Sequence, residues 1–311
     1  MKKGVKIALI VLAAFGALVL ADVIASVIYK KVNERTETHE LKQSFTSIKV
    51  DVATSDVEFV KTKKGYGKVV CKETNQHRHT VKVEDGTLKI TFDHKYKFNF
   101  LMFSPDYKVL VYIPATAQYE FDANSTTGDL YVGAGFTFSN AKIKGSTGER
   151  VVLANVKNKV EIESSTGGIH LSKMKPASIN VETSTGDLYV TDVTCSGDIY
   201  AKSSTGQKLF ENVKANNLTV EASTGKLISK KVILSNKLIS KSSTGDVKIQ
   251  YSDAKEIDIK TTTGDVDVEF LTSKIVYAKT TTGEMNVPKS TKGGLCSIET
   301  TTGDIKVTIA K

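Results

Sequence analysis

Apolar and polar residues alternate in short stretches along most of this chain, which is the period of a β-strand with one buried face. After residue 115 the alternation recurs every nineteen or twenty residues, and each period contains a Ser/Thr-Thr-Gly triplet. Apolar residues stand two and four positions after the glycine, as at Leu188 and Val190, and seven and five positions before it, as at Ile179 and Val181. Each period is therefore predicted to be strand, turn, strand, turn.

So short a period is typical of stacked repeats, in which each unit buries its apolar side against its neighbours. The predicted fold is all-β, a parallel β-solenoid of about ten rungs over residues 116–311. Each glycine is expected at a corner that needs a positive φ or a close backbone approach. The threonine before it is expected to join a ladder of hydroxyl groups. The predicted corners are Gly128, Gly148, Gly167, Gly186, Gly206, Gly225, Gly245, Gly264, Gly283 and Gly303.

Residues 41–115 also alternate but lack the triplet, so an irregular β N-terminal cap of the solenoid is predicted there. This cap contains the most apolar stretch after residue 31. It is interpreted either as a segment packed over the open solenoid end or as an exposed patch that faces a membrane or a partner. The candidate patch residues are Phe98, Phe100, Leu101, Met102 and Phe103.

The chain begins with three lysines and a twenty-three-residue, mostly apolar run from Ile7 to Tyr29. A helix needs about 20 residues to cross a bilayer, so residues 1–31 are predicted to be a single transmembrane anchor. The alternative is a cleaved signal peptide. Residues 32–40 are predicted to be a polar stalk. Either reading places the C-terminal domain outside the cytoplasm, and the favoured anchor places it at the cell membrane.

The formal charge of +9 suggests nucleic-acid binding until it is divided along the chain. Residues 116–311 have twenty-four basic and twenty-two acidic side chains, a net charge of only +2. That balance gives no electrostatic footprint for a polyanion, so nucleic acid is not an expected partner. The three cysteines, Cys71, Cys195 and Cys296, suggest no disulfide framework, and Cys296 replaces an apolar core residue.

The position after each corner glycine is often acidic, and stacking would bring such carboxylates within about 5 Å of one another. This row is a candidate cation ladder. The competing readings are carboxylates that accept turn N–H groups and pairing with neighbouring lysines. The last four members are Asp246, Asp265, Glu284 and Asp304.

His77, His79 and His94 form the only histidine cluster, and His77 and His79 would share one strand face. No nearby Cys, Asp or Glu is expected to complete a metal site, so exposed loop histidines are the favoured reading. No phosphate-binding loop, metal motif or nucleophile elbow occurs in the chain. No enzyme activity and no cofactor are therefore expected.

The repeats at Ser184–Val190, Ser243–Ile249 and Thr301–Val307, with the lead-in Val109–Pro114, resemble the bacterial putative-adhesin family. That family is a membrane-anchored β-strand-repeat domain of unassigned biochemistry. The likeness covers roughly residues 41–311. It implies the architecture and carries over no binding residues. The chain departs from the family's repeat pattern at Glu149–Arg150, Gln207–Lys208 and Lys226, which leaves any acidic ladder interrupted.

The predicted function is non-enzymatic binding or scaffolding in the bacterial cell envelope through repetitive polar faces. Another envelope protein or a cell-wall glycan is the expected partner. One alternative is a membrane-anchored accessory of an envelope-stress response, and another is a polysaccharide-active enzyme. The last strand, Ile305–Ile309, is predicted to leave an uncapped edge, so end-to-end self-association through the C-terminal rung is also predicted.

Overall fold

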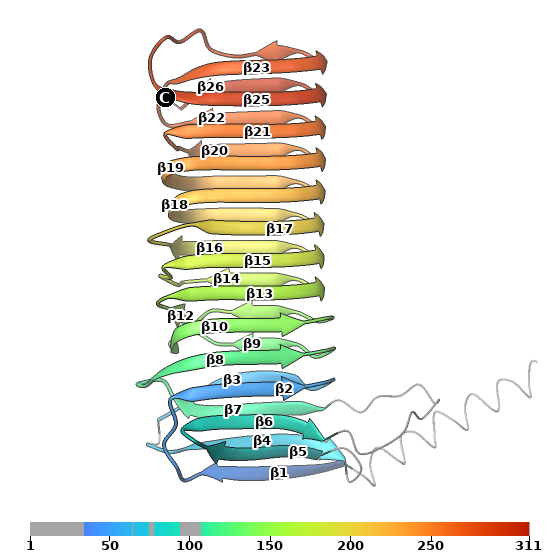
Figure 1. Ribbon diagram of the computed structural model, residues 1–311, viewed down its shortest axis with the longest axis vertical. Helices are drawn as coiled ribbons and strands as arrows, with labels where there is room; N and C mark the ends of the chain where they lie inside the picture. The colour runs from blue at the N-terminus through green and yellow to red at the C-terminus, as the bar shows by residue number, and fades with distance from the viewer. Residues whose placement is uncertain (1–33, 64, 75–77, 94–106, 311) are drawn as a thin grey trace, which may run out of the picture.

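The structure is a computed structural model that describes residues 34–63, 65–74, 78–93 and 107–310. These residues form an all-β column, a parallel β-solenoid of about nine turns without a helix (Figure 1). The predicted anchor at 1–31 and the aromatic patch at 98–103 lie outside the described residues. Within those residues, no helix is both long enough and apolar enough to span a membrane.

The first thirteen strands in chain order are β1 (Glu34–Leu41), β2 (Ser47–Val52), β3 (Asp56–Thr62), β4 (Gly67–Thr74), β5 (Arg78–Glu84), β6 (Thr87–Asp93), β7 (Lys108–Pro114), β8 (Gln118–Ser125), β9 (Leu130–Val132), β10 (Thr137–Gly145), β11 (Arg150–Val152), β12 (Asn155–Val156) and β13 (Lys159–Thr166). The remaining strands are β14 (Ile169–Ser172), β15 (Ser178–Thr185), β16 (Leu188–Thr194), β17 (Ile199–Thr205), β18 (Lys208–Thr224), β19 (Leu227–Thr244), β20 (Val247–Ser252), β21 (Glu256–Thr263), β22 (Val266–Phe270), β23 (Lys274–Thr282), β24 (Met285–Asn286), β25 (Gly294–Thr302) and β26 (Ile305–Ile309).

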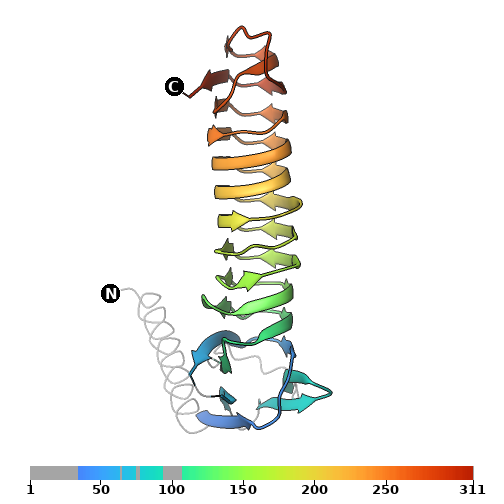
Figure 2. The same cartoon turned by 90° about the vertical axis from the view of Figure 1, so that its left-hand side faces the viewer.

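Two ladders of paired strands run the length of the column (Figures 1 and 2). The first ladder runs β5–β6–β2–β8–β10–β13–β15–β17–β18–β19–β21–β25–β23. The second runs β1–β4–β7–β3–β9–β11–β14–β16–β18–β19–β20–β22–β26–β24. The long strands β18 and β19 belong to both ladders. Pairing in the ladders is parallel except for β1–β4, β4–β7 and β5–β6, which lie in the cap.

The predicted corner glycines form one unbroken vertical row. Gly186, for example, has φ 137°, and an added Cβ would overlap the carbonyl oxygen of Gly167 in the rung below. Both reasons given for glycine at the corner are therefore correct, because the residue needs a left-handed φ and also allows the close approach of two backbones. Either requirement alone disfavours any larger residue.

The core is a set of inward-facing apolar ladders between the two sheets. Val190 and Ile162, among others, are completely buried. Each such side chain contributes about 1.5–3 kcal/mol on burial. The hydroxyl groups that serve the corner are those three positions before the glycine, because Ser203 Oγ and Thr300 Oγ1 donate to the carbonyls of Thr205 and Thr302. The threonines directly before the glycines stack in register, as Thr166 and Thr185 do, but no hydrogen bond joins their exposed side chains in the described part of the chain. The predicted hydroxyl ladder is therefore not formed at that position.

The stacking order departs from the chain order at the C-terminal end. Strands β25 and β26 insert between β21–β22 and β23–β24, so that the last repeat lies beneath the one before it. The prediction that Ile305–Ile309 forms the uncapped edge is therefore wrong. The terminal rung is β23–β24 instead (Figure 1). Because similar repeats can pair in the same register, the period alone does not determine which rung lies next to which.

The N-terminal end shows the same kind of insertion. Strands β2 and β3 lie between β6–β7 and β8–β9 and form a rung of regular shape. Ser55 occupies the place of its corner glycine, since Gly128 stacks directly over the Ser55 carbonyl. The stretch expected to be a stalk contains strand β1, which pairs with β4 along its whole length.

Candidate functional site

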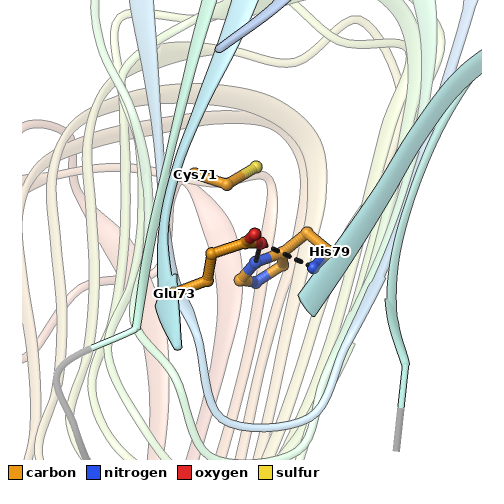
Figure 3. A group of neighbouring side chains, drawn as sticks. All are labelled: Cys71, Glu73 and His79. Carbon is orange, nitrogen blue, oxygen red and sulfur yellow. Dashed lines mark hydrogen bonds and ion pairs between the residues drawn. The ribbon is translucent and has the colours of Figure 1, made fainter. Parts of the chain in front are cut away.

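A buried group of polar side chains lies in the N-terminal cap, below the row of corner glycines. Strand β4 supplies Cys71 and Glu73, strand β5 supplies His79, and the corner between β2 and β3 supplies Ser55. All four residues are at most 5% exposed. Figure 3 shows the Glu73 carboxylate beside the His79 ring, with the Cys71 thiol on the same side. This group is called the cap cluster below.

The cap cluster is held by short polar contacts. Ser55 Oγ lies 2.7 Å from His79 Nε2, and His79 Nδ1 lies 3.2 Å from Glu73 Oε2. The backbone N–H of His79 donates to the same carboxylate oxygen at 2.8 Å. Arg35 Nε forms an ion pair with Glu73 Oε1 at 3.3 Å, although this buried oxygen accepts no hydrogen bond. The contacts fix the ring of His79 between an alcohol and a carboxylate.

The surroundings shift the pKa values of two members in opposite directions. Burial, together with the carboxylates of Glu73 and Glu37, raises the pKa of the Cys71 thiol to about 12. Burial alone would raise the pKa of Glu73, but hydrogen bonds from the side chain and backbone of His79 hold it below its usual range. Near neutral pH the cluster therefore contains a carboxylate and a protonated thiol.

The order Ser55–His79–Glu73 is that of the hydrogen bonds in a serine hydrolase relay. A relay also needs a nucleophile that a substrate can reach. Ser55 is completely buried, so a substrate does not reach its hydroxyl group. The arrangement therefore does not support hydrolysis in this conformation.

The structure corrects the sequence interpretation of the histidines. His77 and His94 lie outside the described residues, and His79 is buried rather than exposed in a loop. Cys71 and Glu73 do lie beside His79, with one ligand atom from each residue within 4.8 Å of the others. The expectation that no Cys or carboxylate completes the group is therefore wrong for His79.

The acidic row bonds to the backbone of neighbouring rungs. Asp265 Oδ1 accepts the backbone N–H of Asp304 at 2.9 Å, and Asp304 Oδ1 accepts that of Glu284 at 2.8 Å. Asp246 Oδ1 lies 3.3 Å from the backbone nitrogen of Asp265, and its Oδ2 contacts Lys226 Nζ at 3.4 Å. The geometry therefore favours the turn-N–H reading of this row, in the order 246, 265, 304, 284.

Two of the noted departures from the repeat place buried cations inside the column. Arg150 donates hydrogen bonds to the carbonyls of Ser125, Gly128, Thr147 and Glu149 at 2.7–3.1 Å. Lys208 is equally buried, and its one hydrogen bond within the described part of the chain goes to the carbonyl of Thr224, at 3.3 Å. Burial lowers the pKa of both groups. These cations serve carbonyls at the corners and do not reach solvent.

A mostly apolar stripe runs along the outside of the second ladder, on the position three residues after each of the first six corner glycines. The side chains stack in register over six consecutive rungs, and the same column continues with Lys248 and Asp267. At about 4.8 Å per rung the stripe is about 24 Å long. The outer stripe consists of Tyr131, Val151, His170, Tyr189, Leu209 and Ile228.

A hollow of about 450 Å³ opens beside the middle of the outer stripe. It exists because Gly168 interrupts the row of larger side chains after the corners, between Glu149 and Asp187. The rings of His170 and Tyr189 stack at 4.5 Å along its side, and Tyr189 Oη donates to Asp187 Oδ2 at 3.1 Å. The hollow thus combines an aromatic wall with carboxylates at both ends.

The sequence contains signals for the outer stripe and for the rung that contains Ser55. The outer stripe could have been found by aligning the repeats on their glycines and reading the column at plus three. The segment around Ser55 matches a repeat with serine in place of glycine. The approach of His79 to Glu73 and Cys71 has no periodic signal, because antiparallel strands outside the repeat bring them together.

Comparisons with known proteins concern the whole column. No curated protein matches the chain. A solved structure described as a putative lipid binding protein from Parabacteroides distasonis ATCC 8503 has a TM-score of 0.49 and 16% identity, covering 88% of this chain and 97% of its own. A putative adhesin from Bacteroides fragilis NCTC 9343 has a TM-score of 0.40 and 13% identity, covering 88% and 96%. Another from Parabacteroides distasonis ATCC 8503 has a TM-score of 0.43 and 10% identity, covering 87% and 96%.

The Toastrack DUF4097 family model matches residues 45–206 and again residues 188–311. The two matches together cover the regular column and most of the cap. The resemblance to the bacterial putative-adhesin family, first noted in the repeats, is confirmed. On this coverage, the chain belongs to the Toastrack DUF4097 family.

Proposed function

We propose that this protein is a non-enzymatic binding scaffold of the bacterial cell envelope and that its outer stripe binds a cell-wall glycan. The observation that carries the proposal is the stripe itself, a mostly apolar column on the outside of a sheet whose neighbouring outward columns are mostly polar. Exposed apolar surface that is continuous over several rungs commonly marks an interaction site. Tyr131 is 42% exposed at one end of the stripe.

The chemistry around the outer stripe suits an extended sugar polymer. Sugar rings have apolar C–H faces and hydroxyl edges, so they bind where rings lie beside hydrogen-bonding groups. Here the rings of His170 and Tyr189 lie next to the carboxylates of Glu149 and Asp187. A one-dimensional row of equivalent rungs also suits a ligand that is itself a linear repeat.

The cellular location of the protein is also part of the proposal. The predicted anchor at residues 1–31 supports a single-pass membrane protein with the column outside the cytoplasm. An accessory role in an envelope-stress response is the alternative, and it predicts that a membrane protein copurifies with the full chain.

The test is cosedimentation of the purified full chain with insoluble peptidoglycan. We expect saturable binding, a loss of about tenfold in affinity for Tyr131→Ser and Tyr189→Ser, and no release of reducing sugars. Tyr277→Ser is the matched control, because Tyr277 is 66% exposed on the other ladder and should not matter. If binding is absent, or if the control weakens it equally, glycan binding by the outer stripe is refuted. Release of sugar would instead support the enzyme alternative.

A further inference from the structure

The cap cluster contains three different kinds of metal ligand without an assigned role. Cys71 offers a sulfur, His79 an imidazole nitrogen and Glu73 a carboxylate oxygen, and these atoms lie within 4.8 Å of one another. Their residues are between 0 and 5% exposed. We propose that Cys71, Glu73 and His79 bind one divalent transition-metal ion in the N-terminal cap, with zinc as the best match. This proposal is independent of glycan binding by the outer stripe.

The distance between the ligand atoms of His79 and Glu73 suits a tetrahedral ion. Zinc bonds to nitrogen and oxygen are about 2.0–2.2 Å long, so neighbouring ligand atoms in a tetrahedron lie about 3.3–3.6 Å apart. His79 Nδ1 and Glu73 Oε2 are separated by 3.2 Å, which is close to that spacing. Little movement would therefore be needed for both atoms to contact one ion.

The second nitrogen of His79 is already oriented as in a metal site. A ligating histidine usually donates its other ring N–H to an oxygen, which fixes the tautomer and the direction of the ring. Ser55 Oγ lies 2.7 Å from Nε2 and fills this role, leaving Nδ1 to face Glu73 and Cys71. Ser55 is thus a positioning residue in the proposal.

Two buried groups in the cluster lack good partners without an ion. Glu73 is 2% exposed, yet among the described residues its Oε1 accepts no hydrogen bond and forms a single ion pair, with Arg35. No hydrogen bond joins the fully buried Cys71 thiol to the rest of the cluster. Buried polar atoms in native proteins are normally satisfied, and an exception often marks an ion or a water.

The ligand set indicates the kind of ion. Metal binding would displace the proton of the Cys71 thiol and release it to solvent. The resulting thiolate, with an imidazole and a carboxylate, suits zinc and similar borderline metals better than calcium or magnesium, which prefer oxygen ligands alone. Three protein ligands leave one coordination position for water or a further group. The competing reading is a metal-free hydrogen-bonded cluster in which His79 links Ser55 to Glu73.

Metal binding by the full chain distinguishes the two readings. The protein is stripped with a chelator and titrated with Co²⁺, and Zn²⁺ is then used to displace it. We expect one equivalent of Co²⁺ with a sulfur-to-cobalt charge-transfer band, and a rise in melting temperature with Zn²⁺. Cys71→Ser should remove the band, and His79→Gln should weaken binding about tenfold or more.

The control is Cys296→Ser, because Cys296 is as fully buried as Cys71 but lies in the regular column. It should leave the cobalt spectrum unchanged. The spectrum of the unaltered chain also decides the question if a cap variant fails to fold. The proposal is overturned if the folded wild-type chain shows no saturable Co²⁺ binding, or if the charge-transfer band is absent or survives in Cys71→Ser.

Discussion

The regular column and the N-terminal cap satisfy their polar groups in different ways. In the column, Asp265 bonds to Asp304 and Asp304 to Glu284, so each carboxylate serves the equivalent position of a neighbouring rung. In the cap, Ser55 contacts His79, which occupies an unrelated position on an antiparallel strand. Repetition leaves the column few free groups for chemistry. Ligand-type side chains are brought together mainly where repetition stops.

The largest predicted effect comes from breaking the corner row. Gly186→Ala should destabilise the column by about 4 kcal/mol or more, because it combines a left-handed φ with a backbone overlap. The measurement is urea denaturation followed by circular dichroism. Gly133→Ala is the control, since the nearest atom to an added Cβ there is 3.6 Å away, and it should cost less than about 1 kcal/mol. Equal effects for the two variants would contradict the stacked corner.

The next effect concerns a position where the column departs from its own repeat. Arg150→Leu should destabilise by about 3 kcal/mol, because it removes the four hydrogen bonds that the buried guanidinium donates to backbone carbonyls. Gly145 makes room for the guanidinium, since an added Cβ would overlap Arg150. The double variant Gly145→Ser/Arg150→Leu restores the common repeat and should recover part of the loss. A stable Arg150→Leu single variant would show that the four hydrogen bonds are dispensable.

A smaller effect should separate the cap from the column. Ser55→Ala removes the contact with His79 and should destabilise by about 1–2 kcal/mol. Hydrogen exchange should show the loss of protection in β4 and β5, with β13–β21 unchanged, because rungs interact chiefly with their neighbours. Loss of protection spread evenly over the whole column would contradict this division.

The smallest predicted effect has the opposite sign. Lys208→Met should stabilise by about 1 kcal/mol, because it removes a buried charge with a single hydrogen bond. Burial lowers the pKa of Lys208 in the folded chain below 10.5, the ordinary value that holds in the unfolded chain. At a pH between the two values the unfolded chain therefore binds more protons than the folded chain. Wild-type stability at this site should therefore rise as the pH approaches 10.5, and the advantage of the variant should shrink. Urea midpoints across that range measure it, and a constant or growing advantage would contradict the assignment.

The sequence predicts the column well because the physical requirement at each position recurs. Gly186 and Val190 stand in environments that recur along the column, so an alignment of the repeats shows their roles. The stacking order was not predictable in this way. Strand β25 pairs with both β21 and β23 by aligning equivalent repeat positions, so the sequence pattern does not show which strand lies between the other two. The cap was harder still. The first regular rung has Ser55 in place of the corner glycine, so the triplet does not mark it. His79 and Glu73 lie on strands of different ladders, and only the tertiary fold brings them together.

End-to-end self-association of the column is still predicted, but through the edge of β23 instead of the edge of Ile305–Ile309. The terminal rung is β23, with β25 as its only strand partner in the described part of the chain. An unpaired edge of this kind can pair with a second chain. Sedimentation of the protein over a range of concentrations checks this, and a monomer throughout would count against association at either end.

The central claim is that equivalent corners stack vertically while the last repeat inserts out of order, and cysteine crosslinking tests it most directly. Asp267 and Lys306 are paired in register on adjacent strands, so Asp267→Cys/Lys306→Cys should form a disulfide under mild oxidation. Asn286 lies one rung further away, about 10 Å from position 267, so Asp267→Cys/Asn286→Cys should remain reduced. Peptide mapping by mass spectrometry reads out both pairs. Crosslinking of the second pair without the first would contradict the inserted order.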